Sequence, residues 1–354
     1  MTIDSDPMKL SKLEIVGALL VAVCLAMMQM RNIQWKFDSR MGDQIAAMQG
    51  IVNGLPHWRM YQSRVLGPYL TDFTRIILGI DFPEAYVIST TILLAISFFG
   101  LMWAAWDILE TKLAALATAF AVFALNVMLM QGSWIYSWDY IDLIVFSALV
   151  WAIVTNRSLR VIVPILILET FNRDVILVLC CWLILDAIIG ITSSSKVWPK
   201  VHFHLNLKQL LWALTLLLAG YWVIEALRSL LLVKEIGPDM FAGVAPQAGG
   251  HNVFYTLPSN LRRFFATWVM PWQGMALPIN LFILGLPAIM AGVFFCKQPG
   301  LVRASILHFI LYISTFAFGE IYETRVWVCF IPYLVLCSPF MLHGSLALEG
   351  HTRR

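Results

Sequence analysis

Long apolar segments separated by shorter polar ones make up most of the chain. A helix that crosses a membrane needs about 20 mostly apolar residues, and most of these segments approach that length. The segment at 158–169 is short, which is typical of a tilted, re-entrant or buried helix. The pattern predicts one all-α polytopic membrane domain over residues 1–354. Its predicted transmembrane segments, about ten in all, are 13–30, 86–106, 112–130, 138–155, 158–169, 174–191, 209–231, 278–296, 302–319 and 325–343.

Two long polar segments, 31–85 and 232–277, interrupt this series. In the first, apolar residues recur at helical spacing over 45–52 and, more strongly, over 69–80. In the second, residues 260–268 combine arginines with aromatic residues. We expect all three to be short helices that lie at the membrane surface. The second long segment is either a mobile lid over a site or an ordinary connection.

The composition agrees with a membrane protein. Hydrophobic residues make up 60% of the chain and charged residues only 13%. Such a chain would expose large apolar patches in water, so it belongs in a bilayer. The net charge of +3 is too small to favour a nucleic-acid partner. No phosphate-cradling P-loop, Rossmann glycines or serine nucleophile elbow is present, which argues against an ATPase or a soluble-type hydrolase.

The distribution of lysine and arginine predicts the orientation of the segments. With a cytoplasmic N-terminus, the short outer connections carry only Arg173 and Arg325. We therefore expect a multi-pass protein of the plasma or inner membrane, with both termini cytoplasmic and both long segments outside. This orientation requires the segment at 158–169 to cross. The short inner loops carry Lys112, Arg157, Arg160, Lys196, Lys200, Lys208, Lys297 and Arg303.

Charged residues follow the first apolar segment directly. Asp38, Arg40 and Asp43 lie just outside the predicted membrane boundary, and Arg64 follows in a Gln-x-Arg-x-Leu-x-Pro element. A chain that is apolar almost everywhere else has concentrated polar residues here, which favours a functional role. The alternative for Asp38 is a solvated loop acid.

Two further outer segments carry charges. Asp139 and Asp142 begin the fourth apolar segment three residues apart, so they share a helix face. Asp142 would lie about one turn into the membrane, where an ionisable group is costly without a partner. A compact turn then holds Glu169, Arg173 and Asp174. Local ion pairing is the alternative explanation for that turn.

The last outer turn contains Glu320, Glu323 and Arg325. An arginine at the outer end of a segment runs against the usual distribution of basic residues, so it needs an anion. The two glutamates would serve structurally, and a lipid phosphate would serve functionally. The planar guanidinium of arginine binds carboxylate and phosphate equally well.

The arrangement of most of the chain resembles the GT-C superfamily of integral-membrane glycosyltransferases, which take sugars from polyprenyl-phosphate carriers. The stretch from Asp38 through Ala46 to Gly54 is similar to the first-loop signature of that family, although Ser39 stands where a second acid often follows. The turn at Arg173 is similar to a charged turn in many relatives. Arg325, followed by Phe330-Ile331-Pro332, is similar to their late arginine and proline helix.

The resemblance implies a GT-C-like fold and a hexosyl- or pentosyltransferase. Its partners would be membrane lipid, a polyprenyl-phosphate-linked sugar, and a glycan, lipid or protein acceptor. Transfer from a lipid phosphate needs a base near the acceptor hydroxyl and cations near the departing phosphate. We expect Asp38 to be the base, with Asp43 in reserve. No spacing indicates a metal site, although a divalent metal between acids and phosphate is compatible with this chemistry. The expected phosphate- and substrate-binding residues are Arg40, Arg64, Asp139, Glu169, Arg173, Asp174, Glu320, Glu323 and Arg325.

Other classes fit parts of the same pattern. A polysaccharide polymerase or ligase also uses outer arginines and lipid-linked substrates. A flippase or transporter for a lipid-linked glycan would need polar residues along a path through both leaflets, whereas the charges here gather at the outer face. A structural or assembly protein is the simplest alternative.

Overall fold

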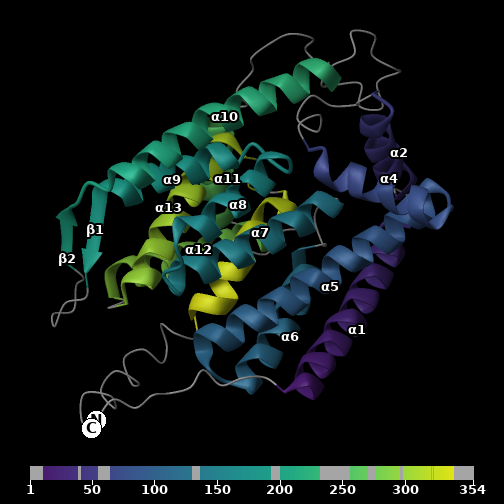
Figure 1. The fold of residues 1–354 in the computed structure, drawn as a ribbon, viewed down its shortest axis with the longest axis horizontal. Helices are drawn as coiled ribbons and strands as arrows, with labels where there is room; N and C mark the ends of the chain where they lie inside the picture. Colours follow the sequence, from purple (N-terminus) through teal and green to yellow (C-terminus); the bar gives the residue numbers. More distant parts are fainter. Residues whose placement is uncertain are drawn as a thin grey trace.

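The computed structural model describes residues 11–38, 41–54, 64–129, 136–192, 200–231, 256–269, 276–295, 298–319, 321 and 323–338. These residues form helices and one two-stranded hairpin (Figure 1). Every predicted apolar segment overlaps a helix. The helices are α1 (Lys12–Lys36), α5 (Phe82–Leu109), α6 (Lys112–Leu129), α7 (Ser137–Val154), α8 (Leu159–Thr170), α9 (Ile176–Ile188), α10 (Leu207–Leu231), α12 (Ala276–Phe295), α13 (Pro299–Phe318) and the 3-10 helix η2 (Thr324–Phe330), which continues as α-helix to Ser338.

Six of these helices, α1, α5, α6, α7, α10 and α13, are long and apolar enough to cross a membrane. Three further apolar helices, Ile176–Ile188, Gly285–Phe294 and Arg325–Ser338, are shorter. The chain is therefore a multi-pass membrane protein. The number of about ten transmembrane segments stays a prediction.

Three short helices lie in the two long polar segments, as predicted: α2 (Met41–Val52), α4 (Leu66–Leu78) and α11 (Leu257–Val269). On α4 the apolar face points away from the protein, with Phe73 60% and Ile76 64% exposed. On its other face Thr71 is fully buried and shares a 2.9 Å hydrogen bond with Ser89 of α5. A helix that turns its apolar side outward is stable only where lipid covers that side.

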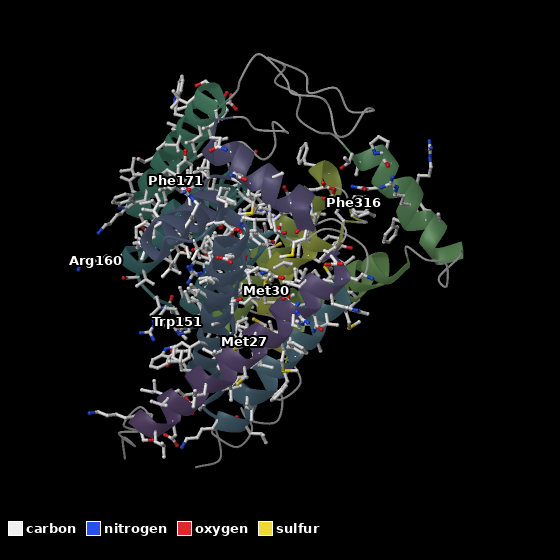
Figure 2. The ribbon with its side chains drawn as sticks, turned by 90° about the vertical axis from the view of Figure 1, so that its right-hand side faces the viewer. Met27, Met30, Trp151, Arg160, Phe171 and Phe316 are labelled. Atoms are coloured by element: carbon white, nitrogen blue, oxygen red, sulfur yellow. The ribbon has the colours of Figure 1, made fainter. Side chains whose placement is uncertain are left out.

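The bundle has two ends, which Figure 1 places on opposite sides. The α4 end contains α2, α4, the beginning of α7 and the turn after α8. The hairpin end contains the β-hairpin, the ends of α7 and α9 and the beginnings of α10 and α13. Helix α8 runs from one end to the other: it starts just after the end of α7, and the turn that follows it bonds to the first residues of α4 and α7. Figure 2 labels Arg160 and Phe171 near its two ends.

The hairpin consists of β1 (Ile189–Thr192) and β2 (Lys200–Phe203), paired antiparallel with Ile189 opposite Phe203. The prediction of apolar helix as far as residue 191 was wrong here, because α9 ends at Ile188. Ile189 is already extended, and its β-branched side chain suits a strand. Pairing with β2 supplies backbone hydrogen bonds that the helix would otherwise have provided.

Helix α7 lies at the centre of the bundle, and glycines allow other helices to approach both of its ends. A Cβ atom on Gly67 of α4 would lie 2.7 Å from Ser137 Oγ. At the other end, a Cβ atom on Gly300 of α13 would lie 2.6 Å from the carbonyl oxygen of Val154. The Gly300 contact is with backbone, so a larger residue there would push α13 away from α7, whereas a larger residue at Gly67 would displace the Ser137 hydroxyl.

A buried ion pair fastens the hairpin end. Arg303 of α13 donates from Nε and Nη2 to the two carboxylate oxygens of Asp186, at 2.6 Å each. Its Nη1 donates to Asn156 Oδ1 at 3.0 Å, and Gln209 Nε2 donates to Asp186 at 2.7 Å. These bonds join four parts of the chain: the turn after α7, α9, α10 and α13. We call these four residues the hairpin-end clasp.

Candidate active site

The beginning of α7 presents two buried carboxyl groups on one face. Tyr136 is the N-cap residue, and its backbone N–H donates to Asp139 Oδ2 at 2.7 Å. This bond supports the first turn of the helix, where the dipole also favours an acid. Asp142 follows three residues later on the same face. Both aspartates are almost completely excluded from solvent, at 0% and 1% exposure.

The turn after α8 brings a counter-charge to these acids. The Arg173 N–H donates to the carbonyl oxygen of Glu169 at 2.8 Å, which closes the turn. The Arg173 guanidinium then forms an ion pair with Asp139, and its Nε lies 2.9 Å from Asp142 Oδ2. Asn172 Nδ2 donates to the Trp138 carbonyl oxygen at 3.1 Å and to Asp142 Oδ1. We call Asp139, Asp142, Glu169, Asn172 and Arg173 the acid–arginine cluster.

The electrostatics of the cluster follow from its burial. Burial by itself lowers the pKa of the Arg173 guanidinium, but the carboxylates of Asp142 and Asp139 more than offset this, so the pKa of Arg173 is raised. Arg173 therefore stays charged. Glu169 is 0% exposed and faces Asp142 and Arg173, and neither of its carboxyl oxygens has a hydrogen-bond partner among the described residues.

Two more arginines lie beside the cluster, each over an aromatic ring. The rings of Tyr136 and Trp138 are stacked, with centroids 4.2 Å apart and planes 15° apart. The guanidinium carbon of Arg64 lies 5.7 Å from the Trp138 centroid, and that of Arg325 lies 5.5 Å from the Tyr136 centroid. Contacts of this kind help to hold a guanidinium in place.

Backbone and side-chain bonds fix both of these arginines. The N–H groups that follow Arg64 in the chain, those of Val65 and Leu66, both donate to the Phe171 carbonyl oxygen at 3.1 Å. Arg64 is thereby attached to the turn that carries Arg173. Arg325 donates from Nε to Glu323 Oε2 at 2.8 Å, while its own side chain is 7% exposed. The prediction that Arg325 has an anionic partner is confirmed for Glu323.

The structure brings together six of the predicted site residues: Arg64, Asp139, Glu169, Arg173, Glu323 and Arg325. Asp174 is half-buried in the same turn. The two predicted catalytic acids lie outside the cluster. Asp38 is exposed, one residue beyond the C-cap Phe37 of α1, and Asp43 is half-buried in the first turn of α2. Arg40 and Glu320 lie outside the described residues.

Helix α2 nevertheless links the first polar segment to α7. Ser137 Oγ donates to Met48 Sδ at 3.6 Å, so α2 lies against the residue that begins α7. Gln44, one turn earlier on α2, is 0% exposed, and its side-chain amide has no hydrogen-bond partner among the described residues. Asp43 is thus attached to a helix that packs beside the cluster, although its carboxyl group is not part of it.

Comparisons of the chain with protein-family models, curated proteins and solved structures found no match. The function must therefore be argued from the site itself. Within the described ranges, no group of three or more His, Cys, Asp or Glu side chains is arranged to hold a metal ion.

Several residues of the site were not among those predicted from the sequence. Asp142 is the clearest, since its position a full turn inside an apolar segment already indicated an ionisable group that needs a partner. Asn172 and the stacked pair Tyr136 and Trp138 carried no such signal. Amide and aromatic residues are common at membrane boundaries, and only the tertiary contacts reveal that these three orient the charged groups.

Proposed function

We propose that this chain is a membrane glycosyltransferase that moves a sugar from a polyprenyl-phosphate carrier to an acceptor outside the cytoplasm. The observation that carries the proposal is the convergence of Arg64, Arg173 and Arg325 at the α4 end of the bundle. These residues are far apart in the chain and come from the beginning of α4, the turn after α8 and η2. Three guanidinium groups gathered at one membrane boundary suit an anionic headgroup.

The three arginines differ in what they offer a phosphate. The charge of Arg173 is already shared by Asp139 and Asp142, so its part is to hold the cluster together. Arg64 lies over the Trp138 ring and also faces Asp142, while Arg325 lies over the Tyr136 ring and pairs with the partly exposed carboxylate of Glu323. We infer that Arg64 and Arg325 bind the phosphate, and that Glu323 holds Arg325 in position until the lipid arrives.

Features next to these arginines suit the lipid part of such a substrate. The outward-facing apolar side of α4 would rest in the headgroup region and keep Arg64 at that depth.

The proton of the acceptor hydroxyl needs a base that an acceptor can reach. The cluster acids are buried and engaged with Arg173, whereas Asp38 is exposed at the end of α1. Asp38 is therefore our candidate base and Asp43 the reserve, as the resemblance to GT-C enzymes also implies. The basic residues at the hairpin end, among them Arg157 and Arg303, favour a cytoplasmic position for that end and for both termini.

The phosphate site is tested by binding in lipid nanodiscs. Polyprenyl phosphate and the matching polyprenol are titrated against the wild type, Arg64→Gln and Arg325→Gln, and tryptophan fluorescence reports binding. Loss of one charge-assisted contact, worth about 1.5–3 kcal/mol, predicts binding roughly 10- to 100-fold weaker for the phosphate alone. Arg75→Gln is the matched control, because Arg75 lies on α4 in an exposed pair with Asp72. Equal binding of phosphate and polyprenol by the wild type would refute the phosphate site.

Transfer is tested separately in proteoliposomes that contain a radiolabelled polyprenyl-phosphate hexose and a membrane extract as the source of acceptor. Wild-type protein should release free polyprenyl phosphate, and Asp38→Asn should lose this release while keeping lipid binding and folding. Asp72→Asn serves as the control acid at the same end of the bundle. Unchanged release by Asp38→Asn removes Asp38 from the mechanism. Movement of the intact labelled lipid between leaflets, without release, would favour a flippase.

A further inference from the structure

The acid–arginine cluster contains more hydrogen-bond acceptors than donors. Among the described residues, neither oxygen of Glu169 has a hydrogen-bond partner, and the same holds for Asn172 Oδ1. The Asn172 Nδ2 group already donates to the Trp138 carbonyl oxygen and to Asp142 Oδ1, and Arg173 Nε faces Asp142 Oδ2 at 2.9 Å. Three buried oxygen atoms from two adjacent side chains thus lack a donor, and each such atom is costly.

The charges are unequal as well. Three carboxyl groups, those of Asp139, Asp142 and Glu169, face two guanidinium groups, those of Arg173 and Arg64. Fully ionised, the group would carry one uncompensated negative charge in a place that excludes water. Burial of an unpaired charge is more expensive than protonation of the acid, so one acid takes up a proton instead.

We propose that Asp142 and Glu169 share one proton and form a buried carboxylic acid–carboxylate pair. The acid O–H supplies the missing donor, since a protonated carboxyl group donates one hydrogen bond and an ionised one donates none. Its acceptors are the Asp142 carboxylate, which also faces Arg173, and Asn172 Oδ1, and both residues face Glu169. The same proton cancels the excess charge. Because the two acids interact directly, the proton belongs to the pair.

Several neighbouring groups bear on this pair. Arg173 contacts Asp142 and faces Glu169. Charges a step further away balance each other, because Arg325 pairs with Glu323. The titratable and charged groups around the pair are Asp139, Arg173, Arg64, Cys329, Tyr86, Tyr140, Arg325 and Glu323.

This proposal is independent of the proposed transferase activity. It gives the Asp142–Glu169 pair one shared proton in the resting protein, so the pair carries a single negative charge and neither acid acts as the general base. It also explains how a third acid is tolerated beside Asp139 and Asp142 in a water-free place.

Infrared spectroscopy of the full-length protein in nanodiscs tests the proposal directly. A protonated carboxyl group absorbs at a higher frequency than a carboxylate, and its band shifts in heavy water. At neutral pH the wild type should show this band, and Glu169→Gln should lose it, because the remaining Asp142 is then ionised beside Arg173. Glu84→Gln, which alters an exposed glutamate at the same end of the bundle, should keep the band.

Two results would overturn the proposal. One is a wild-type spectrum at neutral pH without a protonated carboxyl band. The other is a band that persists in both Glu169→Gln and Asp142→Asn, since it then arises elsewhere. If Glu169→Gln fails to fold, Asp142→Asn takes its place, and a band that persists there overturns the proposal.

The dependence of stability on pH gives a second measurement. The folded pair holds a proton that the unfolded carboxyl groups release at neutral pH, so the folded state binds more protons. The thermal midpoint of the wild type should therefore fall as the pH rises from mildly acidic to alkaline. Glu169→Gln should show a smaller fall, and an identical pH profile for the two proteins would contradict the shared proton.

Discussion

Replacement of Arg173 by glutamine tests the cluster most directly. The guanidinium of Arg173 forms an ion pair with Asp139 and lies 2.9 Å from Asp142 Oδ2, and its side chain is only 13% exposed. Glutamine keeps a polar group of similar reach but removes the charge. The two aspartates then stay buried without their main counter-charge, although Asp139 keeps the Tyr136 N–H and Asp142 keeps Asn172.

The expected cost follows from this burial. Removal of one partner from a buried ion pair destabilises a protein by about 3–5 kcal/mol, chiefly because an uncompensated charge is left behind. The bonds that the aspartates retain place Arg173→Gln near the lower end, at about 3 kcal/mol. The pair between Arg75 and Asp72 gives the contrast, because the Arg75 side chain is 43% exposed and such pairs contribute about 1 kcal/mol or less.

The free energy of unfolding in detergent solution, measured by denaturant titration, provides the assay. Arg173→Gln and Arg75→Gln are compared with the wild type and with the double variant Arg173→Gln/Asp142→Asn. Removal of the stranded charge should restore roughly 1–2 kcal/mol in the double variant, since contacting residues couple by about 0.5–3 kcal/mol. The reasoning is refuted if Arg173→Gln costs no more than Arg75→Gln, or if the two substitutions in the double variant are additive.

Two further predictions concern the hairpin end. A methyl group on Gly300 would lie 2.6 Å from the Val154 carbonyl oxygen, so Gly300→Ala should lower the free energy of unfolding by about 1–3 kcal/mol. Gly100 has nothing within 4 Å of such a methyl group, so Gly100→Ala should instead stabilise α5 by up to about 1 kcal/mol. Equal shifts of the thermal midpoint in the two variants would contradict this. Arg303→Met should cost about 3 kcal/mol of unfolding free energy because Asp186 is only 6% exposed, and a loss below about 1 kcal/mol would show that the clasp is solvated.

The apolar pattern was sufficient to locate the helices. Each predicted segment corresponds to a helix, because a chain in lipid must satisfy its backbone groups within the segment itself. The pattern was less informative at boundaries. It extended α9 into β1, since apolar β-branched residues such as Ile189 and Ile191 suit both a helix end and a strand.

The candidate site was predictable only in part. Several of the charged residues singled out in the sequence lie together in the structure, whereas Asp38 and Asp43 lie outside the cluster. The sequence indicated Glu323 as a partner of Arg325, and the structure contains that pair. The sequence did not reveal that Arg173 joins Asp139 and Asp142, because these residues come from different parts of the chain.

The sequence by itself determined that this is a helical membrane protein with its charges gathered in a few turns, since burial of apolar surface and satisfaction of the backbone are local requirements. The tertiary structure decided which of those charges form one cluster. Asp139, Asp142 and Glu169 meet because α8 returns along α7, and the approach of α4 at Gly67 places Arg64 beside them. Contacts between segments distant in the chain depend on helix packing and side-chain volume, which no local pattern records.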